Sequence, residues 1–330
     1  MASGALRARV RALMIVAALA LAASTRISSA PWAVSAPPSC GVSNARTQQS
    51  YTSLQAAVDA AKARDTLEVR GRCVGSTTVA KAITIKRQAG PGILDGGGAG
   101  TVIHITRGTT TIEGLKITNG VANVVSVEGN GCCVGGGIAV SGDRAGARLV
   151  DSLVTGNSAT VFGGGIDVDA GTLTLVNSTV SENTAWSAGG IDSDFGTVTL
   201  IGSTVSGNTA AGGTTCQDVG SCAGGIWNFG GTLTLIDSTV SANTANRRGG
   251  GIVNQTPTGG PAAVLTLSGT ASITDNHAFG DPDPPALGGG IWIRGGATVA
   301  ATADWTGSIS ANTPDQCSPT VTIGSTTCGP

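Results

Sequence analysis

The sequence has 330 residues, of which 52 are glycine, and charged residues make up only 12% of it. Its 19 basic and 20 acidic residues almost cancel, so we expect no nucleic-acid partner and no attraction to an anionic membrane. The glycine content and the lack of an amphipathic helix after about residue 63 argue against leucine-rich and helical repeats, because those usually place a helix in every unit.

Residues 1–36 are typical of a secretory signal peptide. Arginines precede the apolar run 12–23, and the small residues 34–36 offer a cleavage site, with Ala30 as a rival. The apolar run is too short to span a membrane, and no second run follows it. We therefore expect a secreted or cell-surface protein with no transmembrane segment in the mature chain.

A short helix is predicted near the start of the mature chain. In the stretch 53–62, helical spacing places Leu54, Ala57, Val58 and Ala61 on one face. An open end of a repeat protein exposes core side chains and unpaired strand edges. We therefore expect this helix to cap the first coil.

From residue 148 onward the chain repeats a unit of about 25 residues, which is typical of a stacked solenoid. Apolar positions alternate within the unit, as in Leu173-Thr174-Leu175, and this period of two predicts strands. The sequence therefore predicts an all-β fold, a right-handed parallel β-helix over residues 37–316 with the short N-terminal capping helix. Residues 317–330 form the predicted tail of this single domain.

One asparagine recurs in every unit. Asparagine tolerates the left-handed backbone of a tight corner, and its amide can bond to the equivalent asparagine in the next coil. The glycine runs that precede an isoleucine in each unit predict a second sharp corner. The expected ladder contains Asn157, Asn183, Asn208, Asn243, Asn276 and Asn312, with Asn119 as a candidate first rung.

Two stretches carry a resemblance to known families. The run YTSLQAAVDAAKARDTLEVRGRC at 51–73, followed by ITIKRQAGPGILDGGG at 83–98, resembles the opening of pectin-lyase-like right-handed β-helix proteins. The later GGGI and STVSxNTA units resemble the repeats of polymorphic outer-membrane-type and other bacterial surface proteins. The resemblance implies the fold but not an activity, since such proteins include lyases, hydrolases and adhesins.

Eight cysteines in an exported chain predict disulfides. These bonds would fasten the first coil, an inserted loop and the C-terminal tail. The expected pairs are Cys40–Cys73, Cys216–Cys222 and Cys317–Cys328, while Cys132 and Cys133 have no assigned partner other than each other.

One face of the predicted β-helix carries unusual side chains. After each corner isoleucine the side chains alternate, so the first and third residues that follow are expected to face outward. Acids on adjacent coils would lie about 5 Å apart, and their repulsion calls for water, a cation or a raised pKa. The candidate ligand-binding residues are Asp167, Asp169, Asp192, Asp194, Trp227, Phe229, Trp292 and Arg294.

Three interpretations of this face remain open. It can be a solvated acidic patch beside exposed aromatic rings. It can bind Ca²⁺, since hard oxygen ligands cluster there. It can also be a carbohydrate-binding groove, in which rings cover sugar faces and carboxylates accept hydroxyl hydrogen bonds. The sequence requires no other cofactor, and the candidate metal ligands are Asp167, Asp169, Asp192 and Asp194.

Catalysis receives less support from the sequence. Arg294 is expected about 14 Å from Asp192, and His104 and His277 are expected on the surface away from the acids. The Asn-Thr-Asp and Gly-His-Gly motifs of polygalacturonases are absent. We therefore expect an adhesin-like binding or structural module with polysaccharide or cell-surface glycan as its partner. The alternative is a polysaccharide lyase or glycoside hydrolase that acts on acidic polysaccharide.

Overall fold

The computed structural model describes residues 39–123, 135–212, 222–280 and 286–329. The predicted signal peptide therefore lies outside the described residues. The described chain contains one α-helix, α2 (Leu54–Ala60), which begins at Ser53, whose hydroxyl accepts a hydrogen bond from the N–H of Ala56. Leu54, Ala57 and Val58 are buried, as the helical spacing predicts. No helix in these residues is both long enough and apolar enough to cross a membrane.

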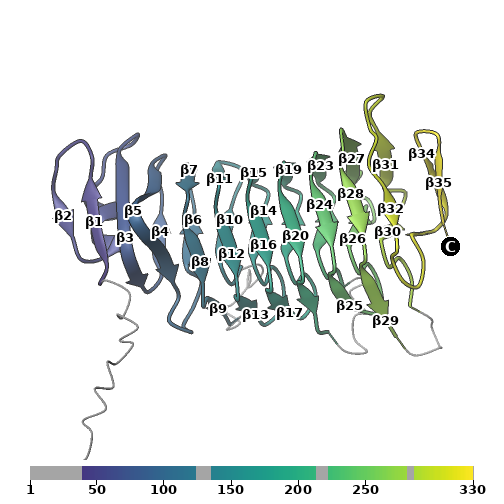
Figure 1. The fold of residues 1–330 in the computed structure, drawn as a ribbon, viewed down its shortest axis with the longest axis horizontal. Helices are drawn as coiled ribbons and strands as arrows, with labels where there is room; N and C mark the ends of the chain where they lie inside the picture. The colour runs from purple at the N-terminus through teal and green to yellow at the C-terminus, as the bar shows by residue number, and fades with distance from the viewer. Residues whose placement is uncertain (1–38, 124–134, 213–221, 281–285, 330) are drawn as a thin grey trace, which may run out of the picture. The chain divides into compact units, whose positions relative to one another are not determined.

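The strands form three long sheets and one small hairpin, and Figure 1 shows the strands of successive coils lying side by side. Sheet A has 18 strands, which are β1 (Gly41–Asn44), β2 (Ser50–Tyr51), β3 (Thr66–Val74), β5 (Thr84–Asp95), β7 (Gly108–Glu113), β8 (Lys116–Thr118), β11 (Ala145–Val150), β12 (Leu153–Thr155), β15 (Thr172–Val176), β16 (Thr179–Ser181), β19 (Thr197–Ile201), β20 (Thr204–Ser206), β23 (Thr232–Ile236), β24 (Thr239–Ser241), β27 (Val264–Ser268), β28 (Ser272–Thr274), β31 (Thr298–Ala301) and β32 (Ile309–Ser310).

The other two long sheets are shorter. Sheet B contains β4 (Thr77–Val79), β6 (Ile103–Ile105), β10 (Ile138–Ser141), β14 (Ile166–Asp169), β18 (Ile191–Asp194), β22 (Ile226–Phe229), β26 (Ile252–Gln255), β30 (Ile291–Arg294) and β33 (Cys317–Ser318). Sheet C contains β9 (Val121–Ala122), β13 (Ser158–Ala159), β17 (Thr184–Ala185), β21 (Thr209–Ala210), β25 (Thr244–Asn246) and β29 (His277–Phe279). The hairpin pairs β34 (Val321–Ile323) with β35 (Thr326–Cys328).

Each coil between β6 and β29 passes through all three sheets, as the coil of β14, β15, β16 and β17 does. Strands of adjacent coils pair in parallel with equivalent residues opposite each other, so Leu173 meets Val198 and Leu175 meets Leu200. Every second side chain therefore enters the same narrow core, where these four residues are at most 1% exposed. The all-β parallel β-helix predicted from the period of two is confirmed.

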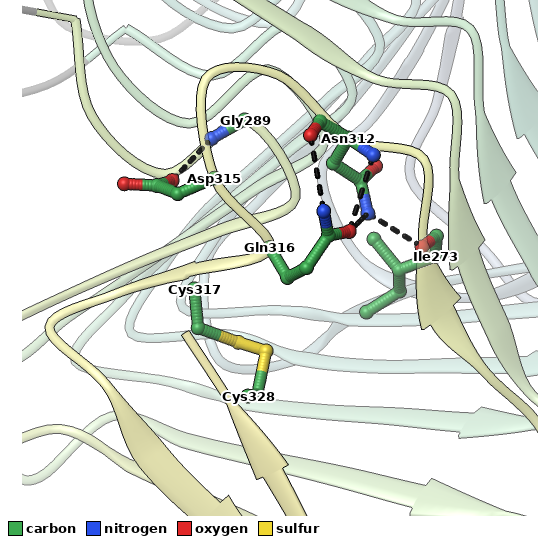
Figure 2. Close-up of a disulfide and its surroundings, with 7 residues drawn as sticks. All are labelled: Ile273, Gly289, Asn312, Asp315, Gln316, Cys317 and Cys328. Carbon is green, nitrogen blue, oxygen red and sulfur yellow. Dashed lines mark hydrogen bonds between the residues drawn. A yellow bond between two sulfur atoms is a disulfide. The ribbon is translucent and has the colours of Figure 1, made fainter. Parts of the chain in front are cut away.

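Buried asparagines form the predicted ladder. After Asn157, the Oδ1 atom of each one accepts hydrogen bonds from the backbone N–H and the side-chain Nδ2 of the asparagine one coil earlier. Both bonds are 3.0 Å long where Asn183 donates to Asn208. Gln316 ends the series, because its Oε1 accepts the same two bonds from Asn312 (Figure 2). The rungs are Asn157, Asn183, Asn208, Asn243, Asn276 and Asn312.

Two details of the ladder differ from the expectation. Asn119 is not a rung, because the N–H of the next residue, Gly120, donates to Asn157. The left-handed backbone also falls on the residue before each asparagine rather than on the asparagine itself. That preceding residue has φ +65° at Gly156, +56° at Glu182, +63° at Gly207, +54° at Ala242, +57° at Asp275 and +57° at Ala311. The asparagine is thus required for its buried amide and not for its backbone.

Disulfides fasten both ends of the stack. The predicted bonds Cys40–Cys73 and Cys317–Cys328 are present, and Figure 2 shows the second one directly after Gln316. Cys222 is disulfide-bonded as well. Its expected partner, Cys216, and the adjacent pair Cys132 and Cys133 lie outside the described residues.

Candidate functional site

Sheet B brings the candidate residues together on its outward side, in two columns. Strands β14 and β18 place Asp167 beside Asp192 and Asp169 beside Asp194. Strand β22 adds Trp227 beside Asp192 and Phe229 beside Asp194. We call the residues one place after each isoleucine the first column and those three places after it the second column. The first column includes Asp167, Asp192, Trp227, Val253 and Trp292, and the second includes Asp169, Asp194, Phe229, Gln255 and Arg294.

The first column is buried, so the expectation that all eight candidate residues are exposed is wrong for four of them. Asp167 and Asp192 are 0% exposed, Trp227 is 5% exposed and Trp292 is 6% exposed. The backbone leading into each glycine corner covers the column: a Cβ added to Gly163 would lie 2.7 Å from the Cβ of Asp167. The tryptophans pack there with small and apolar residues, namely Ala188, Ala223, Val253, Phe162, Phe229 and Leu287.

The paired carboxyls of Asp167 and Asp192 are the most unusual groups in the first column. All four of their oxygens are buried and none makes a hydrogen bond of full geometry, although the two carboxyls and the backbone of Ser193 are close enough to affect one another. Burial raises the pKa of both carboxyls well above the ordinary value, and the charge of Asp194 raises it further. Two ionised carboxylates cannot bond to each other, but a protonated one can donate its O–H to its neighbour. The buried pair therefore holds a proton more readily than exposed carboxyls do.

The second column is partly open to solvent. Burial, and then the charge of Asp169, raises the pKa of Asp194 to about 6. Phe195 follows Asp194 and is 48% exposed, and its ring meets Phe229 edge-on with centroids 5.6 Å apart. Phe229 in turn contacts Trp227 at 5.9 Å. Aromatic rings thus connect the buried column to the surface beside two acids.

Four further residues belong to this face and were not among the eight candidates. Phe195 lies in a bend and Arg248 in an isolated bridge to Leu287, where alternation does not apply. Phe162 precedes a glycine corner, with its ring 5.4 Å from that of Trp227. Ser141 of β10 lies beside Asp169 in the second column. The signal for Phe195 was its position directly after the acid pair of β18.

His104 is also on this face, which corrects the expectation for that histidine. Its place in sheet B is beside Ala139, which is itself paired with Asp167, so it shares the first column two strands away from the acid. Its Nε2 lies 3.0 Å from the hydroxyl of Ser141. Burial lowers the pKa of His104 and favours the neutral imidazole. His277 is in sheet C, where it bonds to Thr313.

A metal centre does not emerge from the acids. Within the described residues, no group of three or more His, Cys, Asp or Glu side chains is arranged to hold a metal ion. The Ca²⁺ hypothesis therefore gains no support from the geometry.

Comparisons of the chain with protein-family models, with curated proteins and with solved structures find no match.

Proposed function

We propose that this protein is an exported β-helix that acts at or outside the cell surface as a binding and structural module for glycans. The two described disulfides support an oxidising compartment. The stacked coils supply a rigid scaffold whose outward columns keep a fixed spacing of about 4.8 Å from strand to strand. A polymer of sugar units can contact several coils of such a surface at once.

The second column carries the proposal, because it places open aromatic rings beside acids. Phe195 is half exposed, and its ring meets that of Phe229, which lies beside Asp194. Asp169 lies on the next strand beyond Asp194. Sugars offer apolar ring faces and hydroxyl donors, and these match aromatic carbons and carboxylate oxygens respectively. The buried first column holds this surface in place and does not contact the ligand.

The test is a glycan array followed by titration calorimetry on any glycan that binds. Phe195→Ala should weaken binding by about 1 to 3 kcal/mol, which is typical of an anchoring aromatic residue. Phe279→Ala is the matched control, since Phe279 is 58% exposed but lies in β29 of sheet C. The proposal is wrong if no glycan binds or if the two variants bind equally well.

A second candidate function, glycoside hydrolase or polysaccharide lyase, is favoured by one observation. Asp194, with a pKa of about 6, lies beside Asp169 on the adjacent strand. Retaining glycosidases pair an acid of raised pKa with a second carboxyl about 5 Å away. Release of reducing sugar or unsaturated product from a polysaccharide panel, abolished in Asp194→Asn, would favour this function over binding alone.

A further inference from the structure

Three arginines converge at the C-terminal end of the same face. Arg247 and Arg248 precede the glycine corner that leads into β26, and Arg294 is the last residue of β30. The guanidinium carbon of Arg248 lies 4.7 Å from the centre of the Trp292 ring, and that of Arg294 lies 5.6 Å from it. Two cationic groups therefore share one indole ring.

The third arginine is held in an unfavourable position. Arg247 is only 7% exposed, and its Nη1 is buried without a hydrogen-bond partner. Its backbone has φ +97°, in the region that L-residues rarely adopt. Backbone strain of this kind persists where the surroundings impose it and is frequent at ligand clamps.

Described acids do not neutralise Arg247 or Arg248. Ion pairs in which both partners are described lie in the first coils and are Arg46–Asp65, Arg72–Asp95 and Lys86–Glu68. Burial lowers the pKa of Arg248, and the nearby charges of Arg294 and Arg247 lower it further. A buried cation without a counter-charge is costly, and a bound anion would remove that cost.

We propose that Arg247, Arg248 and Arg294 bind a sulfate or carboxylate group of an acidic polysaccharide. Guanidinium groups suit this role, because their planar N–H donors match the oxygens of both anions in pairs. The inference rests on the proposed glycan function and specifies its ligand. Arg294 is three strands from Asp194 in the second column, about 14 Å away. The bound polymer would carry an anionic group at the arginine end and none beside the acids.

Three polymers with the same backbone test the site: dextran, dextran sulfate and carboxymethyl-dextran. Wild-type protein should bind at least one of the two anionic polymers at least tenfold more tightly than dextran in titration calorimetry. Whichever is preferred identifies the anion as sulfate or carboxylate. Arg248→Gln and Arg294→Gln should each remove most of this preference, and its size should fall as salt is added.

Arg148→Gln is the matched control, because Arg148 is exposed on β11 of sheet A. If Arg148→Gln lost as much of the preference for the anionic polymer as the site variants do, the polymer would be attracted unspecifically to the whole protein. This result would overturn the site. Equal binding of all three polymers, unchanged in the arginine variants, would overturn the anion site and leave glycan binding intact.

Inorganic sulfate separates failure of the site from failure of the glycan proposal. If none of the polymers binds, the melting temperature is compared in sodium sulfate and in sodium chloride of equal ionic strength. Sulfate stabilises proteins generally. The informative quantity is therefore how much the gain in melting temperature in sulfate differs between variants. A larger gain for wild type and Arg148→Gln than for Arg248→Gln supports the site. Equal gains overturn it.

Discussion

Asp167 and Asp192 occupy positions that neighbouring coils fill with alanine, tryptophan or valine. The column is closed to water at all of these positions, so the two acids must lose their hydration when the chain folds. A protonated carboxyl loses much less than a carboxylate. The consequence is a fold whose stability depends on how many protons this pair retains.

The pH dependence of unfolding should therefore be steep and should depend on Asp192. A carboxyl whose pKa is raised by folding stabilises the protein fully below its ordinary pKa of 3.8, and this stability is lost as pH rises through the raised value. We expect the free energy of unfolding to fall as pH rises above about 4, through the raised pKa values of these carboxyls. The fall should be clearly smaller in Asp192→Asn, as measured by urea denaturation at a series of pH values.

Asp143→Asn serves as the control, because Asp143 is exposed and should leave the wild-type slope unchanged. Asp194, with its pKa of about 6, keeps part of the slope in every variant that retains it. Parallel pH profiles for Asp192→Asn and wild type would contradict the assignment of the pair.

Trp227 is a structural residue, although its outward position in the strand pattern predicts an exposed ring. It is 5% exposed and its ring contacts those of Phe162 and Phe229. Trp227→Ala should lower the free energy of unfolding by about 3 to 5 kcal/mol, as large core truncations do. Phe195→Ala should cost much less, since Phe195 is half exposed. Equal thermal melts for the two variants would place Trp227 at the surface.

The asparagine ladder links successive coils through buried side-chain amides, and the stability that it contributes can be measured. Asn208 accepts two hydrogen bonds from Asn183 and donates through Nδ2 to Val180 and Asn243. Asn208→Leu removes these side-chain bonds and leaves buried partners unpaired, which should cost about 3 kcal/mol or more in urea denaturation. Thr174→Ser, on the outward side of β15, should change stability by about 0.5 kcal/mol at most. Similar losses in both would mean that the ladder contributes little.

The residue before each ladder asparagine must adopt a left-handed backbone conformation. Ala242 has φ +54°, whereas the equivalent residues 156 and 207 are glycine. Ala242→Gly should therefore raise the free energy of unfolding by about 0.5 to 1 kcal/mol, because glycine adopts this conformation without strain. Ala300→Gly in strand β31 is the opposite control and should destabilise by a similar amount. Loss of stability in both variants would contradict the corner assignment.

Local patterns predicted the fold, and non-local contacts limited the prediction of the site. Alternation in Leu173-Thr174-Leu175 and the spacing of the asparagines determine which side chains face inward and which residues meet between coils. Whether an outward residue of sheet B is exposed depends instead on the segment that leads into the glycine corner before its strand. This segment has no repeating pattern, so the burial of Asp167 and the approach of Arg248 to Trp292 were not visible in the sequence.

Each end of the stack of coils needs its own cap. Cys317–Cys328 joins strand β33 to the terminal hairpin of β34 and β35. Replacing both cysteines by alanine should cost at most about 3 kcal/mol, because the loop is short. Amide exchange should accelerate in β34 and β35 but not in the central strand β15, and mass spectrometry can measure both. Equal acceleration in β15 would show that the bond supports the whole stack.

Successive ladder residues are 25 to 36 positions apart in sequence, yet their hydrogen bonds are nearly identical. The additional residues fall between strands, as between β21 and β22, and the paired positions do not change. The coils between Asn157 and Asn276 therefore present the same ladder contacts to the coils on either side. Duplication or loss of a whole coil in the gene would keep the stack continuous, and loops could diverge in one coil without disturbing the next. The chain can thus lengthen by copying itself and acquire new surface chemistry one coil at a time.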